Sequence, residues 1–455
     1  MLNYIWLALL LCAVVIGGVT GHLKEVTEGA FDGAKTAVTI SLGLIGIMAL
    51  WLGVMRLAER AGLIQKLAHG LRPVMRRLFP GVPDDHPAMG SMLMNMAANM
   101  LGLGNAATPL GLRAMRDLET LNPHPGRATN AMCTFLAINT SSVQLIPTTA
   151  IAILVAAGST NPTAIVGTSL LATLCAATVA IVSVKLLEKL PWFRVGAIGG
   201  IVDPGQPQHR AANSRPAMED ETLPGAAGVN SPGSNLPLWG KGMLALLLIF
   251  FLALFVRQVC PEWFGLSAGS SAPSPSYFVR SVSALSILAI PLLLAFFTLY
   301  AALCGLKVYD EFVEGAKEGF EVILKIIPFL VTMLVAIGMF KGAGGIDLLA
   351  RALSPILTPL QFPTDLLPIA MMRPLSGGAT LALFADVVHR LGPENLVSLM
   401  AATIYGSTET TFYVVAVYFG SVGIRQTRHA IPAGLLADLT GVVASVIICR
   451  AVLGP

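Results

Sequence analysis

Charged residues are scarce in this sequence. Only 12% of its 455 residues are Asp, Glu, Lys or Arg, whereas 55% are hydrophobic. The net charge of +4 is small and scattered along the chain, so nucleic acid is not an expected partner. Several uncharged runs reach the ~20 residues that a helix needs to cross a bilayer. The composition therefore predicts a polytopic membrane protein.

The chain also lacks the residue patterns of several kinds of chemistry. No G-x-x-x-x-G-K-[ST] phosphate loop occurs, so nucleotide hydrolysis by this chain is not expected. No His–Asp–Ser set, Cys–His set or pair of carboxylates suited to hydrolysis stands out, so we expect neither an enzyme nor a cofactor. Five cysteines lie in apolar segments without C-x-x-C spacing, which predicts neither disulfides nor a metal site. These are Cys12, Cys133, Cys175, Cys304 and Cys449.

Hydropathy predicts nine membrane spans and two long segments with interruptions. The spans are 3–20, 36–56, 128–156, 163–187, 239–258, 281–304, 321–341, 394–422 and 428–450, and the interrupted segments are 86–119 and 366–391. Residues 3–20 are interpreted as a membrane helix, because no positive charge precedes them and no signal-cleavage pattern follows. Residues 191–238 are rich in Pro, Gly, Asn and Ser and predict a flexible linker between halves 1–190 and 239–455.

The two halves repeat each other. AGLIQKLAHGLRP at 61–73 aligns without a gap on AGGIDLLARALSP at 343–355, and the same offset pairs GAK at 33–35 with GAK at 315–317. In looser registers, GNAATPLG falls on GGATLALF, and NTSSVQ at 139–144 falls on STETTF at 407–412. A constant offset through a patterned amphipathic segment indicates an internal duplication.

Charge placement predicts the topology. If residues 86–119 enter and leave the membrane on one side, the basic residues before and after them share a compartment with Lys185 and Lys189, which the positive-inside rule identifies as the cytoplasm. We therefore expect a re-entrant hairpin and place the chain in the inner (plasma) membrane with its N-terminus and linker cytoplasmic. Because helix 239–258 has no counterpart in the first half, it reverses the second copy. The amphipathic segments 59–79 and 345–358 then lie at the cytoplasmic and outer interfaces.

The predicted fold class is thus an all-α polytopic membrane protein of two inverted repeats. Each repeat contains an interfacial amphipathic helix, a re-entrant hairpin and a broken transmembrane helix. Interrupted segments at corresponding positions of inverted halves point to a transporter's binding site, because helix ends within the membrane offer N–H and C=O groups to a polar ligand.

The order of GNAATPLG, NTSSVQLIP, RPLSGGATLALF and YGSTETTFYV resembles spore maturation protein A fused to spore maturation protein B. Both belong to the nucleoside recognition, or gate, domain group, which is similar to parts of concentrative nucleoside transporters and of the ferrous iron transport protein B. The resemblance assigns 1–190 to the first protein and 239–455 to the second. It implies an elevator-like fold whose hairpins and broken helices enclose a central site.

Ionisable residues in apolar segments are the most informative candidates. Glu409 is expected to face a cavity or a partner, as a ligand contact, a cation site or a proton carrier. In concentrative nucleoside transporters the corresponding helix carries an acidic residue near the substrate, although the local motif differs here. Arg373 can pair with Glu409 as a structural lock or bind an anionic group, and the sequence does not decide between these roles. For Asp438, ion coupling and pairing with a neighbouring helix both stay open.

Polar uncharged residues surround these charges. The hydroxyls near Glu409 either bind a ligand or cap the helix break, and those after Arg373 either contact a ligand or form a tight turn. In the first half, side chains before Pro147 can hold a sodium ion or a polar solute. The candidate substrate-binding residues are Asn105, Thr108, Asn139, Thr140, Ser141, Ser142, Gln144, Arg373, Ser376, Thr380, Ser407, Thr408, Glu409 and Thr410, and the candidate ion-coupling residues are Glu409 and Asp438.

The sequence favours a secondary transporter that moves a small polar solute, nucleoside-like or anionic, by alternating access. Na⁺ or H⁺ is the candidate coupling ion. We expect the protein to contact membrane lipid, and the sequence leaves open whether it forms a homo-oligomer. The alternative is a structural or regulatory membrane protein that retains the gate fold without transport. A channel-like pore is a weaker third hypothesis.

Overall fold

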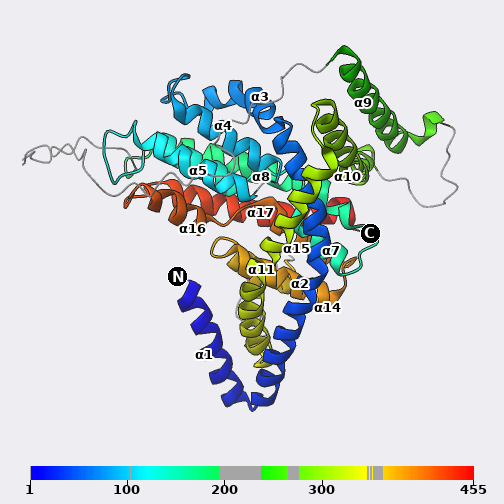
Figure 1. Cartoon of the computed structure of the whole chain (residues 1–455). Helices are drawn as coiled ribbons and strands as arrows, with labels where there is room; N and C mark the ends of the chain where they lie inside the picture. The colour runs from blue at the N-terminus through cyan, green and yellow to red at the C-terminus, as the bar shows by residue number, and fades with distance from the viewer. Residues whose placement is uncertain are drawn as a thin grey trace, which may run out of the picture.

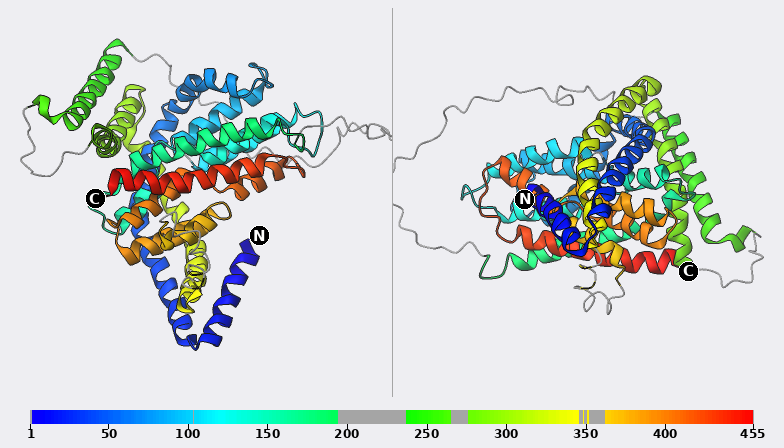
Figure 2. Two further views of the ribbon diagram at one scale, coloured as in Figure 1. Left: turned by 180° about the vertical axis from the view of Figure 1, so that it is seen from behind. Right: turned by 90° about the horizontal axis from the view of Figure 1, so that it is seen from below.

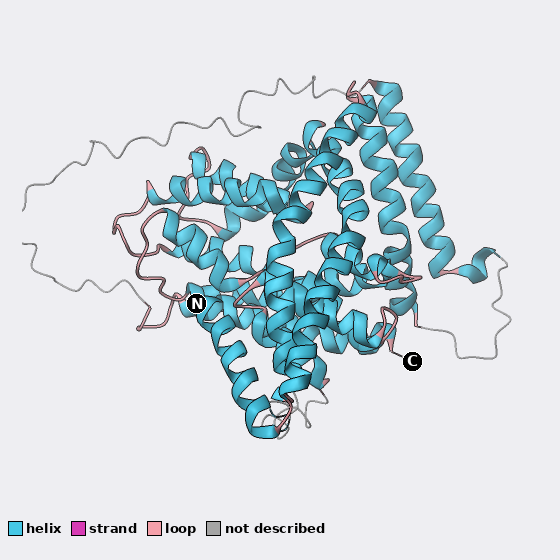
Figure 3. Ribbon diagram, turned by 60° about the horizontal axis from the view of Figure 1, so that its bottom comes forward, coloured by secondary structure: helices cyan, strands magenta, loops and turns pink. Residues whose placement is uncertain are grey.

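The computed structural model describes residues 2–102, 104–193, 237–264, 276–345, 348, 351 and 362–454, and this part of the chain contains helices and no strand (Figure 3). Six of its helical segments are long and apolar enough to cross a membrane. They are α2 (Leu23–Arg60), η1 with α8 (Pro162–Leu187), α9 (Leu238–Val259), α10 (Tyr277–Leu303), α11 (Val308–Gly342) and α17 (Ala430–Leu453). The predicted all-α membrane architecture is confirmed at this level.

The remaining helices are shorter and fill both halves. In the first half they are α1 (Leu2–Thr20), α3 (Leu63–Leu78), α4 (Pro87–Met100), α5 (Gly104–Glu119), α6 (Asn130–Ser141) and α7 (Thr148–Ala156). In the second half they are η2 (Pro261–Phe264), η3 (Thr364–Leu366), α13 (Leu367–Met372), α14 (Gly377–Leu391), α15 (Leu396–Ser407), α16 (Thr411–Val414) and the π-helical turn η4 (Val415–Phe419). Most of the predicted linker 191–238 and of the predicted amphipathic segment 345–358 lies outside the described residues.

Helices α2 and α11 run together through the molecule (Figure 1). They are antiparallel and touch through glycine, because a Cβ added at Gly29 would overlap the main chain of Gly338, and one added at Gly33 would overlap that of Leu334. The same holds at the other end, where a Cβ on Gly319 would lie 2.7 Å from the Cα of Ala49. Small residues at matching positions let two helices approach backbone to backbone, which is how helices commonly associate in lipid.

The partners in this pair are the two helices that the sequence repeat aligns. Helix α2 has 38 residues and α11 has 35, so they are about 57 and 52 Å long at 1.5 Å per residue. Since the hydrocarbon core of a bilayer is about 30 Å thick, both must tilt steeply or project from it. Arg56 near the end of α2 bonds Glu311 of α11 through its Nε at 3.0 Å and also pairs with Glu318.

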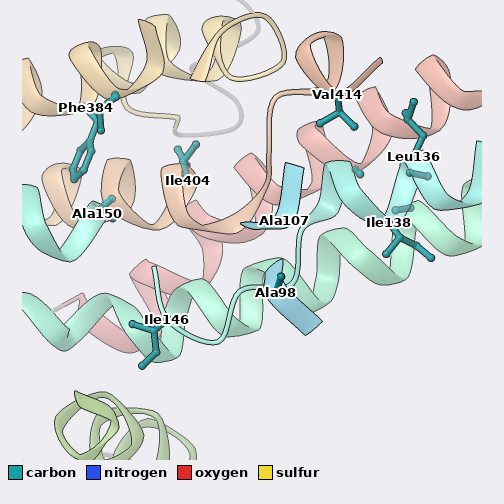
Figure 4. Packing of buried hydrophobic residues seen from close by; sticks show 14 of the residues in the cluster. Ala98, Ala107, Leu136, Ile138, Ile146, Ala150, Phe384, Ile404 and Val414 are labelled. Atoms are coloured by element: carbon teal, nitrogen blue, oxygen red, sulfur yellow. The ribbon is translucent and has the colours of Figure 1, made fainter. Parts of the chain in front are cut away.

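One apolar core joins the two halves. Ala98, Leu136 and Ile146 of the first half lie in the same cluster as Phe384 and Ile404 of the second (Figure 4). Helices α8 and α17, also one from each half, lie side by side (Figure 2). By contrast, α9 packs mainly on α10 and exposes Leu246, Ile249 and other large apolar side chains, as expected for contact with membrane lipid.

Polar contacts also join the halves near the ends of the helices. Arg428, just before α17, donates from Nη1 to the carbonyl of Ala128 at 3.0 Å and to Oδ1 of Asn130 at 2.8 Å. Glu394, before α15, accepts from the hydroxyl of Ser159 and the amide of Thr160, both at 2.8 Å. These hydrogen bonds, the one from Ser159 first, hold the pKa of the Glu394 carboxyl below its usual value.

Substitution of Gly29 by Ala is expected to destabilise the protein by about 1–3 kcal/mol, because the new methyl must force α2 away from α11. The melting temperature of the detergent-purified protein measures this effect. Gly46→Ala is the matched control on the same helix, since a Cβ there meets no atom within 4 Å. Equal melting temperatures for the two variants would contradict the close contact between α2 and α11.

Candidate functional site

Two interruptions of transmembrane-like segments form the centre of the site. Helix α6 ends at Ser141 and α7 begins at Thr148, so residues 142–147, the first break, are not helical. Ser142 adopts a positive φ of 27°, and Pro147 has no N–H with which to continue a helix. The hydroxyl of Thr173 on α8 donates to the carbonyls of Ser141 (2.8 Å) and Ser142 (3.0 Å), which satisfies two groups that the break releases.

The second break, residues 408–410, follows α15. This helix starts with an Asn395 cap, whose Oδ1 accepts from the amide of Val397, and it ends at Ser407. Thr408 and Thr410 are extended, and α16 begins at Thr411. The backbone therefore stops being helical within an apolar region, at the STETT sequence that the repeat aligns with NTSSV.

The two breaks are hydrogen-bonded to each other. The amide of Glu409 donates to the carbonyl of Thr140 at 2.6 Å, and Nε2 of Gln144 donates to Oε1 of Glu409 at 3.2 Å. The first of these bonds joins the end of α6 to the second break, and the second joins the side chains of both breaks. Residues from the two halves thus meet at Glu409.

Main-chain bonds also join each break region to the neighbouring helix pair. The amide of Leu145 in the first break donates to the carbonyl of Met100 at the end of α4. The amide of Phe412, in α16 directly after the second break, donates to the carbonyl of Pro374 between α13 and α14, and both distances are 3.0 Å. Each half therefore contains an amide-to-carbonyl hydrogen bond between its break region and its helix pair. The turn of each helix pair is held against the break of its own half.

Arg373 lies at the end of α13 with only 2% of its surface exposed. Its Nη2 donates to the carbonyl of Tyr405 at 2.9 Å, and its guanidinium carbon lies 5.0 Å from the centre of the Tyr405 ring. Among the described residues no carboxylate forms an ion pair with Arg373, and its Nε has no hydrogen-bond partner. The pairing of Arg373 with Glu409, one of the two predicted roles, is absent from this structure.

Asp438 on α17 is equally buried, with 2% of its surface exposed. The hydroxyl of Thr411 donates to its Oδ2 at 2.6 Å, whereas its Oδ1 has no hydrogen-bond partner among the described residues. The field of Arg373 and that of Glu409 both act on this carboxylate. Asp438 therefore belongs to the same central region as the two breaks.

The predicted hydroxyl residues divide into two groups. Ser376 caps α14 by accepting from the amide of Ala379, and the hydroxyl of Thr380 donates to the carbonyl of Ser376. Ser141 and Ser407 likewise donate to carbonyls of their own helices, those of Ile138 and Ile404. These four side chains bond main-chain groups of their own helices, and Ser407 is the one among them for which the sequence left capping of the helix break open. The hydroxyls of Thr140 and Ser142 are instead buried without a partner among the described residues, and Thr408 and Thr410 are buried beside them.

The amides of the first half form a separate network. Oδ1 of Asn139 accepts from Nδ2 of Asn99 at 3.0 Å and from the hydroxyl of Tyr418 at 3.5 Å. Nδ2 of Asn95 donates to the carbonyl of Ala107 at 2.7 Å and to the hydroxyl of Tyr418 at 3.3 Å. Tyr418, on η4, was not predicted as a site residue. A tyrosine hydroxyl within an apolar run requires a buried partner, and this is the signal that could have identified it.

Two predicted residues contribute less to this description. The side chain of Asn105 lies outside the described residues. Thr108 is half-buried on α5, the second helix of its pair. Of the predicted set, Thr140 and Gln144 bond Glu409, whereas Asn139 belongs to the separate amide network and Ser376 and Thr380 bond main-chain groups of α14.

The sequence pattern that defines the nucleoside recognition (Gate) family matches residues 41–187 and 323–425, which together make up more than half of the chain. The chain belongs to this family. Spore maturation protein A of Bacillus subtilis (strain 168) is 49% identical over 174 residues, which are 38% of this chain and 89% of that protein. Spore maturation protein B of the same strain is 43% identical over 170 residues, 37% of this chain and 96% of that protein. No solved structure matches.

These relatives confirm the predicted resemblance of the chain to spore maturation proteins A and B. Both breaks and both neighbouring helix pairs fall within the residues matched to the Gate family. Asp438 lies beyond them, on α17. The assignment of each half to one relative stays a prediction.

Replacing Tyr418 by Phe is expected to cost about 1–3 kcal/mol, because buried amide groups of Asn95 and Asn139 lose a partner. Chemical or thermal unfolding of the purified protein measures the loss. Tyr413→Phe, at a ring that is 55% exposed, is the matched control and should leave stability unchanged. If both variants unfolded alike, the Tyr418 hydroxyl would not support the amide network.

Proposed function

We propose that this protein is a secondary transporter that moves a small polar solute, nucleoside-like or anionic, across the plasma membrane by alternating access. The observation that carries this proposal is the pair of opposite charges at the breaks. Arg373 is buried with an unused donor, Nε, and Glu409 is hydrogen-bonded to the first break rather than to Arg373. Each charge retains capacity for a ligand group of the opposite polarity.

The pairing of α2 with α11 supports the inverted repeat that such a mechanism uses. A two-fold axis in the membrane plane makes equivalent helices antiparallel, and α2 and α11 are equivalent in the sequence repeat and antiparallel in their packing. In this topology the N-terminus and linker are cytoplasmic, and the second half is reversed relative to the first.

The lengths of the paired helices support re-entrant hairpins. Helices α4, α5 and α14 have 14, 16 and 15 residues, about 21 to 24 Å each, so none alone crosses a hydrocarbon core of about 30 Å. Helix α4 packs on α5, and α13 packs on α14. Such pairs enter and leave on one side, and their turns reach the breaks through Met100 and Pro374.

The chain's residues suggest how solute binding and movement are linked. A solute's anionic group is bound by the Arg373 guanidinium, and its hydroxyl or ring N–H donors are accepted by Glu409. Since Glu409 also bonds Thr140 and Gln144, a ligand at Glu409 acts on both halves at once. Solute binding then favours one arrangement of the hairpins and breaks over the other, which is the basis of alternating access.

A thermal-shift screen of the detergent-purified full chain tests the proposal. Nucleosides, nucleobases, carboxylates and small anions are compared, and a stabilising compound is then tested for uptake into liposomes. Arg373→Ala should abolish stabilisation by an anionic compound. Glu409→Gln should weaken binding by about tenfold or more, because a hydrogen bond to a charged group contributes about 1.5–3 kcal/mol.

Arg113→Ala, at an exposed position on α5, is the control and should bind as the unaltered protein does. The proposal would be contradicted if no compound raised the melting temperature of a well-folded sample. It would also be contradicted if Glu409→Gln took up the solute as fast as the unaltered protein. Either result would favour a structural or regulatory role for the gate fold.

A further inference from the structure

Asp438 is a buried carboxylate in the membrane region, and the proposed solute site does not use it. It is 2% exposed, and within the described part of the chain no Lys, Arg or His forms an ion pair with it. Among the described residues, the hydroxyl of Thr411 donates to its Oδ2 at 2.6 Å and the hydroxyl of Thr408 interacts more weakly with the carboxylate. Burial of an uncompensated carboxylate is unfavourable by several kcal/mol, so the group requires a neutralising partner.

Two glycines bring this carboxylate against the end of α6, the second break and the start of α16. Gly434 lies one turn before Asp438, and a Cβ there would be 2.8 Å from Cγ2 of Thr411 and 3.5 Å from Cγ2 of Thr140. Gly441 lies about one turn after it, and a Cβ there would be 2.5 Å from Cγ2 of Thr408. Because residues three and four apart share a helix face, Asp438 faces the same three threonines.

The threonines carry oxygen atoms that the protein leaves unused. Thr140 and Thr408 are 0% and 3% exposed. In the described part of the chain the Thr140 hydroxyl has no hydrogen-bond partner, and the Thr408 hydroxyl interacts with the Asp438 carboxylate without forming a well-aligned bond. Buried hydroxyls are almost always hydrogen-bonded, so these two beside a carboxylate require an explanation. A carboxylate with several hydroxyl oxygens is the ligand set of a hard cation, and interrupted transporter helices commonly bind Na⁺ in this way.

The charges of the central region indicate the valence of the cation. Arg373, Glu409 and Asp438 are the ionisable side chains of the central region, and in their ionised forms their charges sum to −1. One monovalent cation makes the region neutral, whereas a divalent cation leaves it positive. A proton on Asp438 would also neutralise it, but would engage one acceptor and leave the remaining hydroxyl oxygens unused.

We propose that Asp438 forms a Na⁺ site with the hydroxyls of Thr140, Thr408 and Thr411, joining α17 to the end of α6 and to the second break. The ion stabilises the arrangement in which Thr140 and Glu409 are bonded. Its role in coupling, unlike the site itself, rests on the proposed transport function. By linkage, Na⁺ that orders the breaks raises the affinity for the solute, and solute raises the affinity for Na⁺ by the same factor.

The test measures the melting temperature of the purified full chain, without solute, in NaCl, KCl and choline chloride at equal ionic strength and at pH 6, 7 and 8. Na⁺ is expected to raise the melting temperature in a concentration-dependent manner, as a ligand of the native state does. Asp438→Asn should remove this increase. Thr408→Val should raise the Na⁺ concentration needed by about tenfold or more, and it keeps the test decisive if Asp438→Asn folds poorly.

Thr440→Val is the matched control, because Thr440 lies on the exposed face of α17 and bonds only the carbonyl of Leu436. It should respond to Na⁺ as the unaltered protein does. Equal melting temperatures in Na⁺ and choline would overturn the site, as would a Na⁺ response that persists in Asp438→Asn. A melting temperature that changes with pH but not with Na⁺ would identify Asp438 as a proton carrier, and this result would also overturn the Na⁺ site. Since no solute is present, this outcome is independent of the screen for solute binding.

Discussion

The hydrogen bond between the Glu409 amide and the Thr140 carbonyl is the contact on which the central region depends. Two helices stop within an apolar part of the chain, and each stop releases N–H and C=O groups that hydrocarbon cannot satisfy. The first break bonds the second, each bonds its neighbouring helix pair, and Thr173 satisfies two further carbonyls. Neither break is complete alone, so the site requires both halves of the chain.

The α2–α11 contact makes this meeting of halves possible. Glycines at both ends of the pair bring the helices together along most of their length, and α8 packs on α17, again one helix from each half. A main-chain contact of this kind leaves little room for sliding without loss of packing. We infer that the α2–α11 pair belongs to the fixed part of the molecule, and that movement in the proposed cycle involves the short paired helices and the breaks.

The sequence predicted the order of the elements well, because its signals are local. Pro147 and the polar run before it mark the first break, and STETT marks the second, as the helix ends at Ser141 and Ser407 confirm. The lengths of α2 and α11 were underestimated. Hydropathy placed their spans at 36–56 and 321–341, but the helices continue through charged turns that end the hydropathy signal without ending the backbone hydrogen bonds.

The partners of the central charges could not be predicted in the same way, since they depend on three-dimensional placement. Arg373 binds the carbonyl of Tyr405, one of those that the end of α15 releases, rather than Glu409. Which buried polar atoms have hydrogen-bond partners, and which do not, bears on function. Ser376 and Ser407 find partners in their own helices, whereas the Thr140 hydroxyl and one oxygen of Asp438 have none in the described part of the chain. A purely structural core gains stability from satisfying every buried polar atom. Single unpartnered oxygens also occur elsewhere, as at Thr134 and Ser398, but here they lie beside a buried carboxylate where α6, the second break and α17 meet. This juxtaposition favours a region that binds and releases a ligand over one that only holds the fold together.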